Sequence, residues 1–306
     1  MKTILVATEK PFAAVAVEGI RKEVEAAGHR LVLLEKYTDR AQLLAAAAEA
    51  DAIIVRSDKI NEDVFAAAPN LKIVVRAGAG YDNIDLKAAT AANVVVENTP
   101  GQNSNAVAEL VFGMAVMAAR NMYAGTSGWE LKGKTLGIQA FGQVGRNVAR
   151  IAKGFGMEVS AVDPFCPEEV IAQAGVAPMK TVEDLYRNNA VVSIHIPATP
   201  QTIGSISYDL ITLMPKNGLL INTARKEVVD EAGLARALEA RPDLKYVADV
   251  KPDNAAELEE KFPGRVFFTP KKMGAQTAEA NINAGIAAAR QIVAFFTDGC
   301  DRFRVN

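Results

Sequence analysis

The run from Ala140 to Gly145 has the residue types of a turn that binds a phosphate group. It reads Ala-Phe-Gly-Gln-Val-Gly and lies between an apolar stretch that predicts a buried strand and a stretch with helical periodicity. Gly142 would let the backbone approach a pyrophosphate, and Gly145 would let the helix pack closely on the strand. The free N–H groups at the start of that helix, including those of Gln143 and Val144, would bind the anion.

An acidic residue follows at the distance expected in a dinucleotide-binding unit. Asp163 comes directly after a second predicted strand and 18 residues after Gly145, close to the roughly 20 expected. Its carboxylate would accept hydrogen bonds from the adenosine ribose and repel a 2′-phosphate. Since Pro164-Phe165 supplies no arginine to hold that phosphate, NAD is the predicted cofactor. The turn alone, in which Ala140 replaces the first glycine of the motif, also fits an ordinary strand–helix connection, but the acid favours a nucleotide site.

Short apolar stretches alternate with amphipathic helical stretches along the whole chain, which predicts parallel sheets covered by helices on both faces. The strands predicted in the first third are Ile4–Ala7, Leu31–Leu34, Ala52–Val55, Ile73–Arg76 and Val94–Glu97. Later strands are predicted at Leu136–Gln139, Glu158–Val162, Val191–Ile196, Gly218–Thr223, Tyr246–Val250 and Val266–Thr269. Long helices are predicted from Ser104 to Tyr123 and from Thr277 to Thr297.

This order of elements predicts an α/β fold with two doubly wound parallel-sheet domains. Residues 1–100 would form a flavodoxin-like domain that residues 277–306 complete with the last helix. Residues 101–276 would form a Rossmann-type nucleotide-binding domain inserted into it. A chain of 306 residues is long enough for two such domains.

Composition favours an enzyme of the cytoplasm. The formal net charge of −2 provides no positive field for nucleic acid or an anionic membrane. Two cysteines, Cys166 and Cys300, indicate no disulfide framework, as expected in a reducing compartment. The apolar run at the N-terminus is too short for a signal peptide, and no stretch approaches the roughly 20 apolar residues of a membrane span. No metal site is predicted.

Four further motifs lie at predicted strand ends, where open α/β sheets bind ligands. They are RAGAGYDNID (76–85), SIHIPAT (193–199), INTAR (221–225) and TPKKMGA (269–275). With the glycine turn, their order and spacing resemble the D-2-hydroxyacid dehydrogenase family across essentially the whole chain. The segments VRS (55–57), RAG (76–78) and NTPGQN (98–103) are similar to the phosphoglycerate dehydrogenase subgroup. The end of the chain soon after the last helix is similar to members without an added regulatory domain.

The resemblance implies NAD-dependent oxidation of D-3-phosphoglycerate to 3-phosphohydroxypyruvate, the first step of serine biosynthesis. It implies a homodimer with a small-molecule substrate, and it makes residues 1–100 the substrate-binding domain. Besides the glycine turn and Asp163, the cofactor-binding residues it implies are His195, Pro197, Thr223, Ala224, Asp249 and Gly274. The substrate-binding residues it implies are Arg56, Ser57, Lys59, Ala77, Gly78 and Asn103.

Several family positions carry other residues in this chain. Lys272 stands where the family has its catalytic histidine, which resembles phosphoglycerate dehydrogenases with lysine at that position. The catalytic glutamate is missing, and whether Asp253 or Asn254 replaces it stays open. Lys226 replaces the glycine after the catalytic arginine. His195 belongs to a separate motif and is expected to shape the cofactor pocket rather than to transfer protons.

The expected chemistry survives these replacements. Arg225 has a planar fork that can hold a carboxylate bidentately. Lys272 can act as the acid and base if burial and a neighbouring cation lower its pKa. An imidazole needs an acid to set its tautomer, whereas an amine does not. The alternatives are that Lys271 and Lys272 are a solvated pair and that Arg225 is a structural ion-pair partner.

Two other functions remain open at this stage. One is a hydroxypyruvate or glyoxylate reductase of the same family, which would use the same cofactor and the same carboxylate-binding arginine. The other is a non-catalytic regulator that binds NAD, a possibility motivated by the loss of both the histidine and the glutamate. Turnover of 3-phosphoglycerate with NAD would separate these functions.

Overall fold

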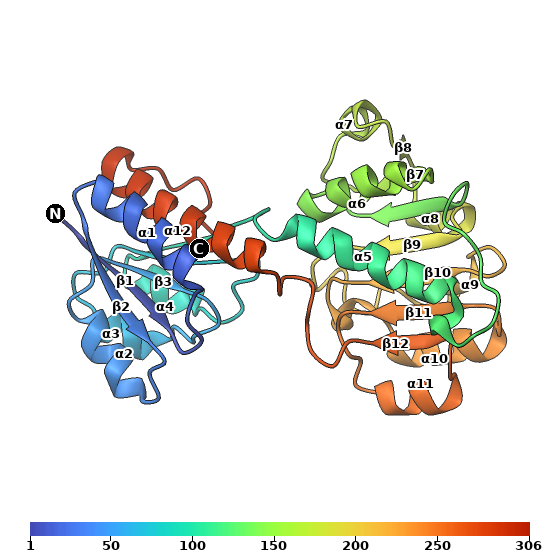
Figure 1. The fold of residues 1–306 in the computed structure, drawn as a ribbon, viewed down its shortest axis with the longest axis horizontal. Helices are drawn as coiled ribbons and strands as arrows, with labels where there is room; N and C mark the ends of the chain where they lie inside the picture. The colour runs from blue at the N-terminus through green and yellow to red at the C-terminus, as the bar shows by residue number, and fades with distance from the viewer. The chain divides into compact units, whose positions relative to one another are not determined.

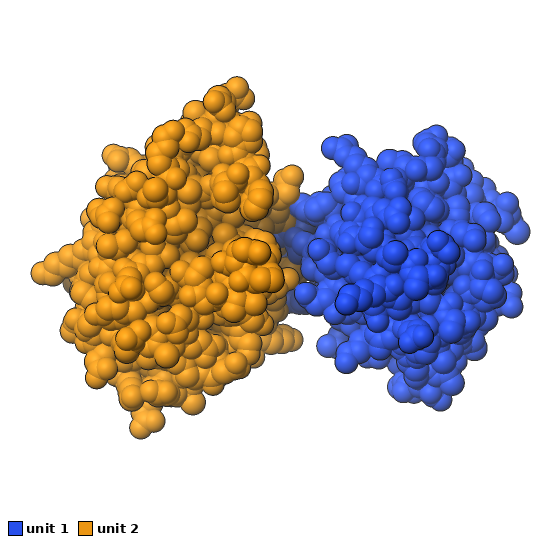
Figure 2. Space-filling view, turned by 180° about the vertical axis from the view of Figure 1, so that it is seen from behind, with its two compact units in different colours: residues 1–103, 276–306 blue, residues 104–275 orange.

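The computed structural model describes residues 1–306, which divide into two compact units (Figure 2). Unit 1 comprises Met1–Asn103 and Gln276–Asn306, and unit 2 comprises Ser104–Ala275. Each unit is a parallel sheet with helices on both faces (Figure 1). The predicted fold class, α/β with two doubly wound parallel sheets, is therefore confirmed.

The sheet of unit 1 has the strand order β2-β1-β3-β4-β5, which is the flavodoxin-like order. Its strands are β1 (Thr3–Thr8), β2 (Arg30–Glu35), β3 (Ala52–Val55), β4 (Ile73–Arg76) and β5 (Val95–Asn98). In β1, Ile4 and Val6 pack toward one layer of helices, whereas Leu5 and Ala7 pack toward the other. Because helices cover both faces, the strand reads as a continuous apolar run rather than an alternating one.

Helices α1 and α12 cover one face of this sheet, and α2, α3 and α4 cover the other (Figure 1). Their bounds are α1 (Ala14–Ala26), α2 (Arg40–Ala47), α3 (Glu62–Ala67), α4 (Leu86–Ala91) and α12 (Ala278–Asp298). The Thr277 hydroxyl caps α12 by accepting from the Ala280 N–H at 3.1 Å. A Cβ at Gly19 of α1 would lie 2.5 Å from the Ile286 side chain of α12. The two helices can therefore pack closely, and the last helix completes the core of unit 1.

The sheet of unit 2, counted from β8, has the strand order β8-β7-β6-β9-β10-β11-β12. This is the doubly wound order of a dinucleotide-binding domain with one strand added. Its strands are β6 (Thr135–Gln139), β7 (Glu158–Val162), β8 (Ala177–Pro178), β9 (Val191–Ile194), β10 (Leu219–Asn222), β11 (Lys245–Ala248) and β12 (Val266–Phe268). The order reverses between β6 and β9, so their carboxyl ends flank the point where such folds bind ligands.

Two layers of helices enclose this second sheet (Figure 1). One layer contains α5 (Ser104–Ala119), α6 (Gln143–Gly154) and α7 (Glu168–Gln173). The other contains α8 (Val182–Asn188), α9 (Tyr208–Thr212), α10 (Glu231–Ala240) and α11 (Ala255–Lys261). Short 3-10 turns lie at η1 (Asn121–Tyr123) and η2 (Lys226–Val228). None of the helices is both long and apolar enough to cross a membrane.

The helix predicted from Ser104 to Tyr123 is shorter than expected, because α5 ends at Ala119. Asn121, Met122 and Tyr123 have left-handed φ angles of 51°, 53° and 57°. Half-buried Lys245 explains the break, since its ammonium donates to the Ala118 carbonyl at 2.7 Å and to the Asn121 side chain at 2.6 Å. These bonds satisfy the end of the helix from a strand that is distant in sequence.

Candidate cofactor and active site

The glycine turn lies between β6 and α6, at the switch point of the unit 2 sheet. Gly145 is buried, and a Cβ there would collide with the Ala140 carbonyl. Gly142 faces open space, with no atom within 4 Å of a Cβ built on it. Helix α6 begins without a side-chain cap and without an acid in its first turn. Its first N–H groups are thus placed for a pyrophosphate, and the turn fits a dinucleotide.

Asp163 lies beside this turn at the end of β7. Its Oδ2 accepts from the Phe141 N–H at 2.7 Å, and its Oδ1 accepts from the Phe165 N–H at 2.8 Å. A carboxylate has about four acceptor sites, so each oxygen can still accept a ribose hydroxyl. Phe165 is 95% exposed directly after Pro164. The geometry is that expected of a ribose-binding acid.

The structure adds Arg146 to this region, a residue that the sequence motifs did not single out. Its Nε donates to the Phe141 carbonyl at 3.1 Å, and its guanidinium lies 5.1 Å from the centre of the Phe141 ring. Its Nη2 lies 3.5 Å from the Cys166 sulfur. The sequence feature that could have identified Arg146 is its position directly after Gly145, the last glycine of the turn. Asp163 and Arg146 thus bind the N–H and the carbonyl of the same residue, Phe141.

His195 follows β9 at the other side of the switch point. Its Nε2 lies 2.9 Å from the Ser193 hydroxyl, and its backbone N–H donates to the Gln139 carbonyl at 2.9 Å. Burial lowers the pKa of His195 to about 3. The ring is therefore neutral near pH 7, which suits a residue that shapes a pocket better than one that donates protons.

Other predicted cofactor contacts lie at neighbouring strand ends. The Thr223 hydroxyl, at the end of β10, is buried without a hydrogen-bond partner within the chain. Such an orphaned donor fits a bound polar ligand, because unsatisfied buried groups are costly. Pro197 is exposed in the segment after β9, and its carbonyl accepts from the Thr202 hydroxyl at 2.5 Å.

Arg225 and Lys272 meet at one backbone oxygen. The Arg225 Nη1 donates to the Ala224 carbonyl at 3.0 Å, and the Lys272 ammonium donates to the same oxygen at 3.2 Å. The two predicted catalytic cations are brought together although 46 residues separate them in the chain. This arrangement pairs a carboxylate-binding fork with a group that can exchange a proton.

A buried asparagine holds the loop that carries Arg225. Asn222, the last residue of β10, is fully buried. Its Oδ1 accepts from the Ala224 N–H at 2.9 Å, and its Nδ2 donates to the Arg225 carbonyl at 2.9 Å. It was missed as a positioning residue because its partners become visible only in the folded turn.

Asp249 holds the loop that carries Lys272. It is fully buried, and its Oδ1 accepts from the Thr269 hydroxyl at 2.9 Å and from the Met273 N–H at 2.7 Å. Its Oδ2 accepts from the Gly274 N–H at 2.7 Å. A Cβ at Gly274 would lie 2.9 Å from that oxygen, so glycine permits the approach. Both residues were predicted as cofactor contacts, and in the structure they brace the lysine loop.

Asp253 and Asn254, the residues considered as replacements for the missing glutamate, bind Lys226 and Glu231. The Asp253 carboxylate is paired with the Lys226 ammonium, so two departures from the family pattern contact each other. The Glu231 carboxylate accepts from the Asp253 N–H at 3.0 Å, and the Asn254 side chain donates to the Glu231 carbonyl at 3.3 Å. Asp253 and Asn254 are thus held by Lys226 and Glu231 at the start of α10 and α11.

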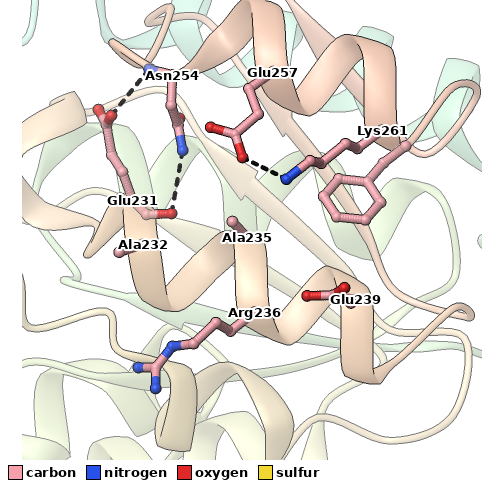
Figure 3. A pocket seen from close by; sticks show the side chains of 9 residues that line it. Glu231, Ala232, Ala235, Arg236, Glu239, Asn254, Glu257 and Lys261 are labelled. Atoms are coloured by element: carbon pink, nitrogen blue, oxygen red, sulfur yellow. Dashed lines mark hydrogen bonds and ion pairs between the residues drawn. The ribbon is translucent and has the colours of Figure 1, made fainter.

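A cavity lies next to this segment, between α10 and α11. It has a volume of about 490 Å³ and contains none of the predicted site residues. Figure 3 shows the two hydrogen bonds between Glu231 and Asn254 at one end and the Glu257–Lys261 ion pair, 2.8 Å, at the other. Because none of the predicted site residues lines it, the cavity is not the site of the predicted chemistry.

In unit 1, Arg56 follows β3, and much of its hydrogen-bonding capacity is used within the unit. Its Nη1 donates to the carbonyls of Lys10 and Pro11, both at 3.3 Å, and its Nη2 donates to the Asn281 side chain at 2.6 Å. The guanidinium also lies 5.3 Å from the Phe12 ring. Burial lowers the pKa of Arg56, which nevertheless stays charged at neutral pH.

Ser57 and Lys59 are exposed in the same segment. Lys59 lines a cavity of about 280 Å³ together with residues 82–85, which include Asp82 and Asp85. These acids oppose the charge of the lysine, which weakens its expected attraction for a phosphate. Arg56 does not line this cavity.

Ala77 and Gly78 are buried at the end of β4, and Asn103 is half-exposed at the last position before unit 2. Gly78 has φ 147°, and a Cβ there would collide with the guanidinium of Arg76. The Arg76 Nε donates to the Arg56 carbonyl at 2.9 Å. Arg76 is thus a cation next to Arg56 and Gly78, two of the predicted substrate-binding residues. Its position in the Arg-Ala-Gly motif could have identified it from the sequence.

Comparisons with known proteins agree with this geometry. Residues 105–270 match the model of the D-isomer specific 2-hydroxyacid dehydrogenase, NAD binding domain. A crystal structure of cofactor (NAD+) bound 3-phosphoglycerate dehydrogenase from Entamoeba histolytica is 48% identical, with a TM-score of 0.88, and the match covers 100% of this chain and 98% of that one. The apo structure of D-lactate dehydrogenase from Escherichia coli, 21% identical with a TM-score of 0.78, shares the fold.

Curated sequences give the same relationship. The D-3-phosphoglycerate dehydrogenase of Methanocaldococcus jannaschii is 36% identical over 273 residues, which are 82% of this chain and 51% of the relative. That of Mycobacterium tuberculosis is 37% identical over 271 residues, again 51% of the relative. The chain thus spans about half the length of the curated relatives it matches. With a nucleotide-binding turn, a ribose acid and these matches, the chain belongs to the D-isomer specific 2-hydroxyacid dehydrogenase family, and unit 2 contains that family's NAD-binding domain.

Proposed function

We propose that the protein catalyses the NAD-dependent oxidation of D-3-phosphoglycerate to 3-phosphohydroxypyruvate, the first step of serine biosynthesis. The observation that carries the proposal is the meeting of Arg225 and Lys272 at the Ala224 carbonyl. The similarity to the Entamoeba histolytica 3-phosphoglycerate dehydrogenase, at 48% identity over almost the full length of both chains, supports this choice of substrate.

In this proposal NAD supplies the acceptor for the hydride that leaves the hydroxyl-bearing carbon. Arg225 binds the substrate carboxylate through its planar fork and so orients that carbon. Lys272, as the neutral amine, accepts the hydroxyl proton during oxidation, and as the ammonium it returns a proton during reduction. Lys272 is exposed, so of the two expected causes that favour a neutral amine, burial does not act on it and the neighbouring guanidinium remains.

The two loops that carry these cations are held by buried polar groups. The Asn222 side chain binds the Ala224 N–H and the Arg225 carbonyl. The Asp249 carboxylate binds the N–H groups of the two residues that follow Lys272. Hydrogen bonds of this kind are strong in a dry interior and costly to lose, so they can keep reactive groups in place. We assign Asn222 and Asp249 the role of positioning residues for the reaction.

The substrate phosphate requires cations besides Arg225. We propose that Arg56, with Lys59, binds it, although Arg56 also braces α12 and Lys59 lies near two acids. Ser57, Ala77, Gly78 and Asn103 would contribute the remaining substrate contacts. The proposal also includes a homodimer, which measurement of the mass in solution would test.

The test is a spectroscopic assay of NADH formation by the purified protein with D-3-phosphoglycerate. Unphosphorylated glycerate and D-lactate serve as comparison substrates, and hydroxypyruvate and glyoxylate are tested with NADH in the reverse direction. We expect the highest kcat/KM for D-3-phosphoglycerate. Preference for hydroxypyruvate or glyoxylate would make the protein a reductase of the same family. NAD binding without turnover of any of these substrates would make it a non-catalytic regulator.

A further inference from the structure

A buried acid lies within the segment after β3 that contains the proposed phosphate-binding cations. Asp58 is 5% exposed and stands between Arg56 and Lys59 in the chain. An anion this close to Arg56 weakens the attraction of the segment for a phosphate. Its presence there therefore requires another explanation, which its hydrogen bonds provide.

One oxygen of Asp58 joins three loops at the carboxyl edge of the unit 1 sheet. The Asp58 Oδ1 accepts from the Glu9 N–H at 2.7 Å and from the Tyr37 hydroxyl at 2.8 Å. Glu9 directly follows β1, and Tyr37 lies in the loop after β2. The strand order reverses between β1 and β3, so the bond to Glu9 crosses the point where a sheet of this order leaves a ligand-binding crevice.

The bond to Glu9 also holds the loop that orients Arg56. Glu9 is followed by Lys10 and Pro11, whose carbonyls both accept from the Arg56 Nη1 at 3.3 Å. Asp58 is thus connected to Arg56 in two ways, through the chain and through the loop after β1. Loss of the bond to Glu9 would release one end of the run that supplies these two acceptors.

Tyr37 supplies the second donor from a buried position. It is 8% exposed, and burial together with the hydrogen bond to Asp58 raises the pKa of Tyr37 well above its usual range. The hydroxyl therefore keeps its proton at neutral and moderately alkaline pH and remains a donor. A buried donor that loses its acceptor is costly, so the bond keeps the loops after β2 and β3 together.

The backbone of the same segment is held from other directions. The Asn83 side chain donates to the Asp58 carbonyl at 2.7 Å, and the Arg40 Nη1 donates to the Lys59 carbonyl at 2.5 Å. These bonds hold the segment toward α2 and the loop after β4, but they do not reach the loop after β1. Asp58 is therefore the residue that connects the segment to the acceptors of Arg56.

We propose that Asp58 and Tyr37 are positioning residues for recognition of the substrate phosphate, because they hold the loops that fix the direction of the Arg56 guanidinium. This inference deepens the proposed function and rests on it, since it requires Arg56 to bind the phosphate. The effect comes from the two hydrogen bonds rather than from the charge. Asparagine can therefore replace Asp58, because its side-chain oxygen can accept both bonds, whereas alanine cannot.

Steady-state kinetics with NAD and D-3-phosphoglycerate test the inference. We expect Asp58→Ala to raise the KM for D-3-phosphoglycerate roughly tenfold, as fits the loss of two hydrogen bonds to a buried carboxylate. The kcat and the KM for NAD should change far less. Tyr37→Phe, which loses one bond, should raise the same KM about threefold. Asp58→Asn should stay close to the wild type.

Asp51→Ala is the matched control at the opposite edge of the same sheet. The Asp51 carboxylate accepts from the Thr3 N–H at 2.8 Å and from the Lys2 ammonium at 2.9 Å, so its removal also frees two donors. It should lower the melting temperature and leave the KM for D-3-phosphoglycerate unchanged. In an Arg56→Ala background, Asp58→Ala should raise this KM no further, because the residue through which it acts is absent.

Three kinetic results would overturn the inference. They are an unchanged KM in Asp58→Ala, an equal rise in Asp51→Ala, and an undiminished effect of Asp58→Ala in the Arg56→Ala background. Equal losses in Asp58→Asn and Asp58→Ala would also contradict it, since the charge would then be responsible. Should Asp58→Ala not fold, Tyr37→Phe, which keeps the aromatic ring, takes its place in each comparison.

Hydrogen exchange at the Glu9 amide separates this inference from the proposed function. Exchange should be faster in Asp58→Ala and unchanged in Asp58→Asn, and the measurement needs no substrate. Absence of turnover by the wild type would reject the proposed function. Unchanged exchange in Asp58→Ala would reject the positioning role, whatever the wild type oxidises.

Discussion

At the scale of single residues, the proposed chemistry depends on two cations that share one acceptor. Because Arg225 and Lys272 both donate to the Ala224 carbonyl, protonation of the lysine places a second positive charge next to the guanidinium. The acid that might have stabilised the ammonium, Asp253, is paired with Lys226 instead.

Substitution of the two lysines separates their roles. Lys272→Ala should lower kcat by about 100- to 10,000-fold, the usual contribution of a general acid–base group, and should leave the Kd for NAD nearly unchanged. Lys271→Ala, on the same exposed loop, should have a small effect. In the wild type, oxidation should accelerate as the pH rises, because the fraction of neutral amine grows. Near-normal turnover of Lys272→Ala with inactive Lys271→Ala would show that the neighbouring lysine is the base.

Ala140 is a strained residue in the cofactor turn. It has φ 82°, a value that favours glycine, and it stands where the usual motif has its first glycine. Ala140→Gly should raise the free energy of unfolding by up to about 1 kcal/mol. Ala92→Gly, at an exposed residue with φ −83°, should instead lower it by about 0.5 kcal/mol. Chemical denaturation measures both, and a loss in Ala140→Gly equal to that in Ala92→Gly would refute the strain.

His195 should make the protein sensitive to acid. Its pKa is lowered to about 3 by burial, whereas an unfolded histidine titrates near 6.5. The unfolded state therefore binds a proton that the folded state does not, so stability is full above about pH 6.5 and declines as the pH falls toward 3. His195→Gln should lose stability less steeply over this range, when both proteins are compared with their own values at pH 8. Parallel pH profiles of the two proteins would contradict this assignment.

At the scale of elements, the strand ends of unit 2 carry polar residues that hold neighbouring loops. Asn222 closes β10, Asp249 follows β11, and Thr269 follows β12. All three are at most 5% exposed. Parallel strands bring their carboxyl ends to one edge, so a buried side chain there can bind the loop of the next strand. The sheet thus sets the distance between the proposed catalytic loops.

Thr269 allows this role to be tested without changing a predicted ligand. Thr269→Val removes the hydroxyl that donates to Asp249 at 2.9 Å, and Thr269→Ser retains it. In Thr269→Val we expect kcat to fall several-fold and the pH profile of oxidation to shift, because the lysine loop is less well held. The KM for NAD should change less. Thr269→Ser should restore both kcat and the profile, and equal losses in the two variants would point to packing rather than to the hydrogen bond.

At the scale of the whole molecule, the chain places the proposed catalytic cations in unit 2 and the proposed phosphate-binding cations in unit 1. The last helix, α12, packs on α1 and accepts a hydrogen bond from Arg56 through Asn281. Arg56 therefore links α12, which completes unit 1, to the segment after β3 that is predicted to bind the substrate.

Substrate specificity should depend on unit 1. Arg56→Ala should lower kcat/KM for D-3-phosphoglycerate by roughly tenfold or more, because a charge-assisted bond to phosphate is lost. The value for unphosphorylated glycerate should change far less. Arg56→Lys keeps the charge but not the fork, and Lys59→Ala tests the second cation. Similar losses for both substrates would show that Arg56 supports the fold of unit 1 rather than the recognition of phosphate.

The sequence by itself determined the fold class and most strand positions. Strands between two layers of helices are apolar on both faces, so each is visible as a short uninterrupted run such as Ala52–Val55, whose observed bounds equal the predicted ones. Helix ends were less well determined. The end of α5 at Ala119 depends on Lys245, whose contact with the helix cannot be read from local periodicity.

Local motifs likewise determined the nucleotide turn and its acid, because Gly142, Gly145 and Asp163 lie within one strand–helix–strand unit. Only the tertiary structure showed that Arg225 and Lys272 donate to the same carbonyl oxygen. It also showed that Asp249 holds a loop more than 20 residues away. The physical reason is that a motif within one supersecondary unit carries its geometry in its spacing. Hydrogen bonds between separate strand ends exist only after the sheet has brought those ends to one edge.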